Sequence, residues 1–73
     1  MKISVRHNVW GNWNCYIGST QVDKFGERID AMFWLANTFL TGNYTVSDKS
    51  YITMSDLQLW LVDHIDCIEL KGK

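Results

Sequence analysis

The residues with the widest chemical range lie near the C-terminal end of the chain. Within five positions the sequence places two carboxylates, an imidazole and a thiol, namely Asp63, His64, Asp66 and Cys67. Such groups bind a divalent transition metal when they converge on one point. On a helix, this spacing spreads the four side chains over most of a turn and a half, so they do not converge on one point. The one other imidazole in the sequence is His7. We therefore expect solvated side chains at a helix end and no metal.

The sequence contains no nucleophile elbow, phosphate-binding loop, dinucleotide fingerprint or serine–histidine–acid constellation. A chain of 73 residues also has little room for a pocket that excludes water. We expect a non-enzymatic protein with no catalytic residues and no cofactor.

Length and composition predict one small folded domain over residues 1–73. Hydrophobic residues make up 47% of the chain, yet the longest apolar run, residues 31–36, is far shorter than the ~20 residues that span a bilayer. The N-terminus has no signal-peptide pattern and the two cysteines have no CxxC spacing, so we expect a cytoplasmic protein without membrane contact. Residues 1–28 carry a net charge of +2 and residues 29–73 a net charge of −3. Neither value reaches the charge density of a typical nucleic-acid binder.

Residues 2–25 have the alternation of a three-stranded antiparallel meander, with a type II′ turn expected at Gly18-Ser19. The expected inner face holds Ile3, Val5, Trp13, Cys15, Ile17 and Val22. The expected outer face holds Lys2, Ser4, Arg6, Asn12, Asn14, Tyr16, Gln21 and Asp23. Trp10, beside the bend at Gly11, falls on the outer side by parity, where Arg6 either pairs with its indole or only packs on it.

From residue 27 to residue 41 the apolar period becomes helical, and Gly42-Asn43 predicts the helix end. We expect this helix to cover the inner face of the sheet, with Phe33 and Trp13 both buried. Trp34 lies in a polar row on the opposite side of the helix. Either the C-terminal segment folds back over Trp34, or Trp34 anchors a partner.

Residues 43–54 form a polar connection with a short extended piece at residues 51–53, where little effect is expected from substituting Ser47 or Ser50. Ser55 and Gln58 then predict a capping box and the start of a second helix. Residues 67–71 either extend this helix or pair as a strand. The predicted fold class is α+β: a three-stranded antiparallel meander packed on one helix, then a second C-terminal helix and, in one alternative, a fourth short strand.

The spacing of Val5-Arg6, Trp10-Gly11, Trp13 and Ile17 resembles that of the first two strands in the ethylene-response-factor type of DNA-binding domain. The resemblance covers residues 3–36 and implies a three-stranded sheet on one helix, with its outer face in the major groove of DNA. Arg6 and Trp10 keep the contact chemistry of that family. Other types stand at the remaining contact positions, namely Asn8, Asn12, Gly18, Gln21 and Asp23.

Aromatic, arginine and amide side chains together are typical of protein interfaces. The sequence therefore predicts a small adaptor or inhibitor, of the kind that phages and mobile elements encode, with a protein partner. The predicted partner-binding residues are Arg6, Trp10, Asn12, Asn14, Tyr16 and Trp34. The alternative is a degenerate DNA-reading module that uses the same sheet face.

Overall fold

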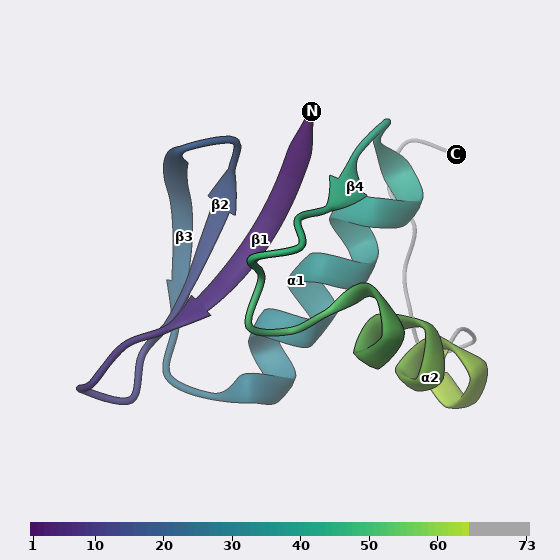
Figure 1. Cartoon of the computed structure of the whole chain (residues 1–73). Helices are drawn as coiled ribbons and strands as arrows, with labels where there is room; N and C mark the ends of the chain where they lie inside the picture. The colour runs from purple at the N-terminus through teal and green to yellow at the C-terminus, as the bar shows by residue number, and fades with distance from the viewer. Residues whose placement is uncertain (65–73) are drawn as a thin grey trace.

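The computed structural model describes residues 1–64. The elements follow in the order β1 (Lys2–His7), β2 (Trp13–Ile17), β3 (Thr20–Phe25), α1 (Arg28–Thr41), β4 (Thr45–Val46) and α2 (Met54–His64) (Figure 1). The strand order in the sheet is β3-β2-β1-β4, with β4 parallel to β1 and the other pairs antiparallel. The predicted α+β fold is confirmed. The fourth strand comes from the connection after α1, whereas residues 67–71 lie outside the described residues.

The turn between β2 and β3 has the predicted type. Gly18 has a φ of 63°, and Ser19 has no positive φ. A type I′ turn needs a positive φ at both central residues, so this pattern fits type II′.

A bulge interrupts the pairing of β2 with β3. Tyr16 pairs with Gln21, but the next pair is Cys15 with Asp23, so Val22 is an extra residue on β3. Val22 is 46% exposed, and its predicted place in the core is therefore wrong.

The bulge also places each later residue of β3 on the face opposite to the one that regular alternation predicts. Residues directly opposite in an antiparallel pair share a face. Asp23 therefore lies on the side of Cys15, and Lys24, which pairs with Asn14, lies on the outer side. The predicted outer position of Asp23 is wrong, because a one-residue slip reverses every later side chain.

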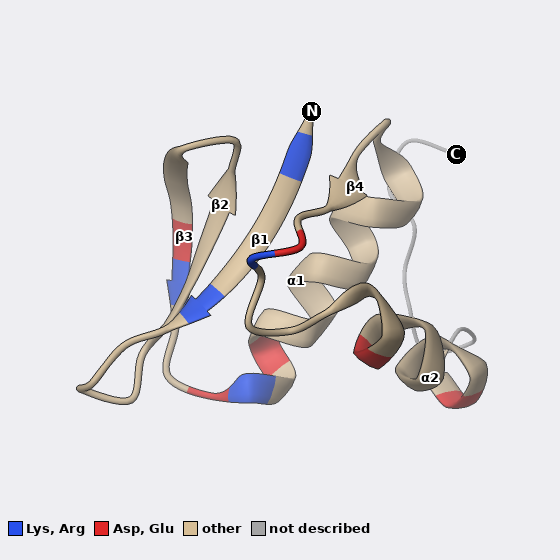
Figure 2. Cartoon of the chain, in the orientation of Figure 1, with Lys and Arg blue, Asp and Glu red and all other residues tan. Residues whose placement is uncertain are grey.

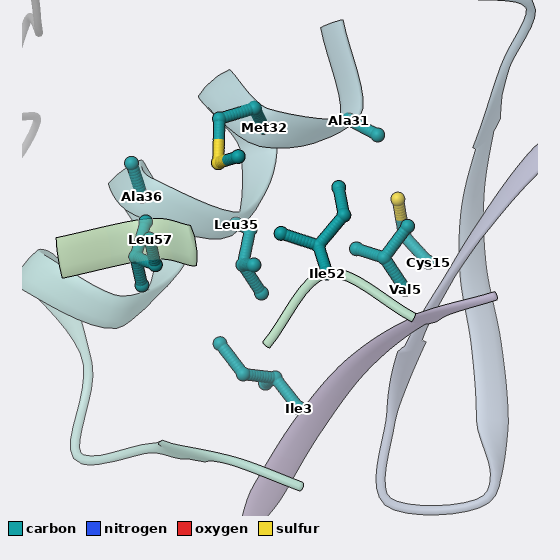
Figure 3. Close-up of a cluster of buried hydrophobic side chains, with 9 residues drawn as sticks. All are labelled: Ile3, Val5, Cys15, Ala31, Met32, Leu35, Ala36, Ile52 and Leu57. Carbon is teal, nitrogen blue, oxygen red and sulfur yellow. The ribbon is translucent and has the colours of Figure 1, made fainter. Parts of the chain in front are cut away.

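The core lies between the sheet and the two helices (Figure 3). Its buried hydrophobic residues are Ile3, Val5, Cys15, Ala31, Met32, Leu35, Ala36, Ile52 and Leu57. Phe33 was predicted to be buried, but it is 37% exposed. Its ring meets the Trp60 ring of α2 edge-on, with the centroids 4.9 Å apart. Phe33 therefore lies on the flank of α1 that faces α2, and not under the sheet.

The connection between β4 and α2 belongs to the core, although its composition is polar. Ile52 is fully buried and Ser50 is only 5% exposed. The Ser50 hydroxyl accepts a hydrogen bond from the Val5 amide at 3.0 Å and donates one to the Ile52 carbonyl at 2.6 Å. The Tyr51 amide then donates to the Val5 carbonyl at 2.7 Å. Ser50 thus continues the pairing of β1 beyond the end of β4. The expectation that substituting Ser50 has little effect is therefore not supported.

The helix α2 begins at Met54 and is capped by Thr53. The Asp56 amide donates to the Thr53 hydroxyl at 3.2 Å, and the Thr53 amide donates to the Asp56 carboxylate at 3.1 Å. These reciprocal bonds have the pattern of a capping box, with aspartate as the acid. The predicted cap at Ser55 is therefore wrong by two residues.

The helix α1 ends at Thr41, as predicted. The Gly42 amide donates to the Thr38 carbonyl at 3.1 Å. A β-carbon at Gly42 would overlap the Tyr44 ring, so this position needs glycine for close packing.

Candidate partner-binding surface

The helix α1 packs on the side of the sheet where Ile3, Val5 and Cys15 are buried, and α2 packs on α1 (Figure 1). The opposite side, which we call the outer face, is built by alternate residues of the three meander strands. Its members are Lys2, Ser4, Arg6, Asn14, Tyr16, Gln21 and Lys24. Lys2, Arg6, Gln21 and Lys24 are exposed, Asn14 and Tyr16 are half-buried, and Ser4 is buried.

Ser4 was expected to be solvated, but it is 4% exposed. It lies on an inner strand, opposite Tyr16 on one side. The segment after β4 hydrogen-bonds to β1 on the other side, through the carbonyls of Ile3 and Val5. Because Ser4 is small, its larger neighbours in the sheet bury it, and no helix is needed for this burial.

One row of the outer face crosses all three strands. Asn14 pairs with Arg6 of β1 and with Lys24 of β3, so the carboxamide lies between two cations. The guanidinium carbon of Arg6 lies 5.1 Å from the centroid of the Tyr16 ring, within the range of a cation–π contact. The aromatic partner of Arg6 is therefore Tyr16, and not Trp10.

Figure 2 shows residues of both signs on the sheet and on the helices, because Asp23 belongs to β3 and Arg28 to α1. Lys2, Arg6 and Lys24 make the charged part of the outer face entirely basic. Asp30 of α1 and Asp56 of α2 lie in the first turns of the helices on the other side. A face whose charges share one sign can orient a charged partner before contact.

The Asn14 carboxamide is not fully satisfied. Its oxygen is buried and has no hydrogen-bond partner within residues 1–64. A buried acceptor without a donor reduces stability, so this oxygen does not stabilise the sheet.

The loop between β1 and β2, residues 8–12, is fixed by Asn8. The Asn8 side-chain oxygen accepts hydrogen bonds from the Trp10 amide at 3.0 Å and the Asn12 amide at 2.9 Å. The Gly11 amide donates to the Asn8 carbonyl at 3.2 Å, and Gly11 has a φ of 85°. We call residues 8–12 the tip loop. This role of Asn8 was not predicted, although asparagine commonly binds the backbone two residues on.

The tip loop displays two apolar side chains. Val9 is 90% exposed and Trp10 is 82% exposed. Trp10 thus lies outside the core as expected, but in the tip loop and not on a strand. Asn12 also precedes β2, and it is half-buried in the tip loop rather than displayed on the outer face.

Trp34 is separate from these residues. It is half-buried on α1, on the helical side, and packs against the core. The structure does not decide between the two alternatives for Trp34, and Trp60 of α2 meets Phe33. Residues 65–73 lie outside the described part of the chain.

Trp13 stays on the inner face, but it is half-buried rather than fully buried. The His7 ring stacks on the Trp13 ring with centroids 4.1 Å apart, and the Tyr51 ring meets Trp13 edge-on at 5.5 Å. This cluster closes the end of the sheet beside the tip loop. Trp13 therefore lies on the predicted face of the sheet, although it is less buried than expected.

In the described part of the chain, the side chains that could carry metal chemistry do not converge. Among residues 1–64, no group of three or more histidine, cysteine, aspartate or glutamate side chains could hold a metal. Asp63 and His64 end the described chain, and Asp66 and Cys67 lie beyond it. Burial, with a smaller effect of the Asp23 charge, raises the pKa of the Cys15 thiol to about 12, which makes the reactive thiolate scarce.

None of the helices within residues 1–64 has the length and apolar character needed to cross a membrane. Comparisons of the chain with protein-family models, curated proteins and solved structures gave no match. The resemblance of residues 3–36 to the ethylene-response-factor type of domain therefore stays a prediction.

Proposed function

We propose that this protein is a small non-enzymatic interaction protein, an adaptor or inhibitor, that binds a protein partner through the outer face and the tip loop. The observation that carries the proposal is Trp10, which is 82% exposed on a loop fixed by Asn8. An indole in water contributes little to folding, whereas a buried indole is among the strongest anchors of protein interfaces.

The fixed conformation of the tip loop matters for affinity. Ordering a flexible side chain or loop costs free energy on binding, and a loop ordered in advance avoids most of that cost. Asn8 holds the backbone at both Trp10 and Asn12 in the free protein. The tip loop is thus suited to insert Val9 and Trp10 into an apolar pocket of a partner.

The outer face adds polar recognition beside this anchor. Arg6, Asn14 and Tyr16 are of types that interfaces use for hydrogen bonds and planar packing. Their side chains share one face, with the Arg6 guanidinium already on the Tyr16 ring. A polar area around an apolar anchor is the usual arrangement of a specific interface.

A DNA-reading module remains the second candidate, and one observation favours it. The bulge at Val22 takes the Asp23 carboxylate off the outer face and brings Lys24 onto it. Three cations neutralise few phosphates. A plot of the logarithm of DNA affinity against the logarithm of salt concentration would therefore have a slope of only about −2.7. Weak phosphate binding is why we place a protein partner first.

The test is affinity capture from an extract of the organism that encodes the protein, with nuclease treatment. Baits are the native protein, the variant with Arg6→Ala and Trp10→Ala, and a matched variant with Arg28→Ala and Leu59→Ala. Arg28 and Leu59 are exposed on the helical elements, so the matched variant removes one arginine and one exposed apolar side chain elsewhere.

We expect one protein to be retained by the native and matched baits and lost from the first variant. Retention by all three baits would contradict the proposal. Loss of the captured material on nuclease treatment would favour the DNA candidate. Circular dichroism of each bait checks that it is folded.

A further inference from the structure

The only acidic residue of the meander, within residues 2–25, is turned away from the outer face. Asp23 pairs with Cys15, on the inner side of the sheet, and its carboxylate accepts a hydrogen bond from the Lys24 backbone amide at 2.8 Å. The cations of the outer face, Lys2, Arg6 and Lys24, therefore have no carboxylate from β1, β2 or β3 on their own side.

From this separation we infer that the partner presents a compact acidic surface, with carboxylates that meet the row of Arg6, Asn14 and Lys24. The inference rests on the proposed function and names the chemistry of the partner. A guanidinium binds a carboxylate through two parallel hydrogen bonds, and an ammonium binds it as a point charge. The carboxamide between them can donate to the same carboxylates.

The dimensions of the row fit a small acidic cluster. Adjacent strands lie about 4.8 Å apart, so the two cations start about 10 Å from each other across Asn14. Two or three carboxylates on a helix or a turn of a partner cover such a distance. The apolar tip loop lies beyond the end of β1, next to Arg6, where it would meet the apolar border of that cluster.

An acidic protein surface fits better than duplex DNA. DNA is uniformly charged along its length, and the affinity of a protein for it depends on how many phosphates the protein neutralises. The outer face offers three cations, and the exposed Val9 and Trp10 beside it require an apolar contact as well as an ionic one.

The experiment titrates the ¹⁵N-labelled full chain with three probes and follows amide and side-chain chemical shifts. The probes are a glutamate-rich peptide with a central leucine, the same peptide with glutamine in place of glutamate, and a short mixed-sequence DNA duplex. The variants are Arg6→Gln and Arg28→Gln, which make the same chemical change on the outer face and on α1.

We expect the glutamate peptide to shift the signals of Arg6, Lys24 and the Asn14 side-chain amide, and the glutamine peptide to bind far more weakly. Arg6→Gln should weaken binding by about threefold to fivefold, and Arg28→Gln should leave it unchanged. Added salt should weaken binding of the glutamate peptide, because charges at the rim of an interface are screened.

Equal losses in Arg6→Gln and Arg28→Gln would overturn the inference, as would equal binding of the two peptides. Tighter binding of the DNA duplex than of the glutamate peptide, lost in Arg6→Gln, would overturn it in favour of nucleic acid. The capture experiment separates this failure from failure of the proposed function. If a protein is still lost on Arg6→Ala with Trp10→Ala, the binding function stands and only the acidic partner is wrong.

Discussion

Replacing Ser50 by alanine should destabilise the protein far more than its place in a polar connection suggests. The Ser50 hydroxyl joins two buried backbone groups, the Val5 amide at 3.0 Å and the Ile52 carbonyl at 2.6 Å. It thereby ties the connection to β1 across 45 positions of sequence. Alanine removes both bonds and adds no group that could replace them.

The magnitude is set by the two groups that lose their partners. Leaving a buried donor or acceptor unsatisfied costs about 1–3 kcal/mol, and neighbouring losses are only partly additive. We expect Ser50→Ala to lower the free energy of unfolding by about 2–3 kcal/mol. A domain of this length has about 4–11 kcal/mol in total, so the loss is a substantial share of it.

Urea unfolding followed by tryptophan fluorescence measures this loss, and thermal unfolding should show a Tm lower by roughly 10 °C or more. The control is Ser47→Ala, in the same connection. The Ser47 hydroxyl accepts one exposed bond from the Lys49 amide at 3.2 Å, so its loss should cost less than about 1 kcal/mol. Equal losses in the free energy of unfolding of the two variants would refute the structural role of the hydrogen bond from β1 to the Ser50 hydroxyl.

Three further outcomes are expected. Thr53→Ala should cost about 1 kcal/mol in urea unfolding and Ser55→Ala clearly less, because the capping bonds belong to Thr53; equal effects would contradict this cap. Trp10→Ala should leave the urea midpoint almost unchanged, whereas Trp13→Ala should lower the free energy of unfolding by about 2 kcal/mol or more, since only Trp13 packs on the core. Folding raises the pKa of the Cys15 thiol from 9.0 to about 12. Between pH 9 and pH 12 the unfolded chain releases a proton that the folded chain keeps, so the free energy of unfolding should fall over this range. Below pH 9 the thiol should have no effect on stability. At about pH 10 the loss should be on the order of 1 kcal/mol relative to a Cys15→Val variant, and parallel pH profiles of the two proteins would contradict the shift.

The meander and α1 could be predicted because their signals are local. Alternation along β1 and β2 and the helical period of residues 28–41 depend on neighbours a few positions apart. The predicted cap of α2 lies two residues late because Thr53 with Asp56 and Ser55 with Gln58 offer similar capping patterns. A sequence read without tertiary contacts does not rank two such candidates.

The roles of Ser50 and Phe33 could not be predicted, because partners far along the chain decide them. Ser50 is buried by a bond to Val5, and Phe33 is turned to the flank of α1 where Trp60 of α2 meets it. A helical period fixes which side chains share a stripe, but not which edge of that stripe faces a second helix. Nothing in residues 43–54 alone marks Ser50 as different from Ser47.

The candidate site shows how one backbone irregularity can alter a functional interpretation. With regular alternation, Asp23 would lie beside Asn14 and the outer face would combine Lys2 and Arg6 with a carboxylate, a net charge of +1. With Val22 as an extra residue, Lys24 takes that place and the charge of the face becomes +3. A bulge leaves little trace in composition or period, since it changes only the register of one pair of strands. The proposed acidic partner of the outer face therefore depends on the Cys15 to Asp23 pairing, and an amide contact map that instead paired Asn14 with Asp23 would remove the basis of that proposal.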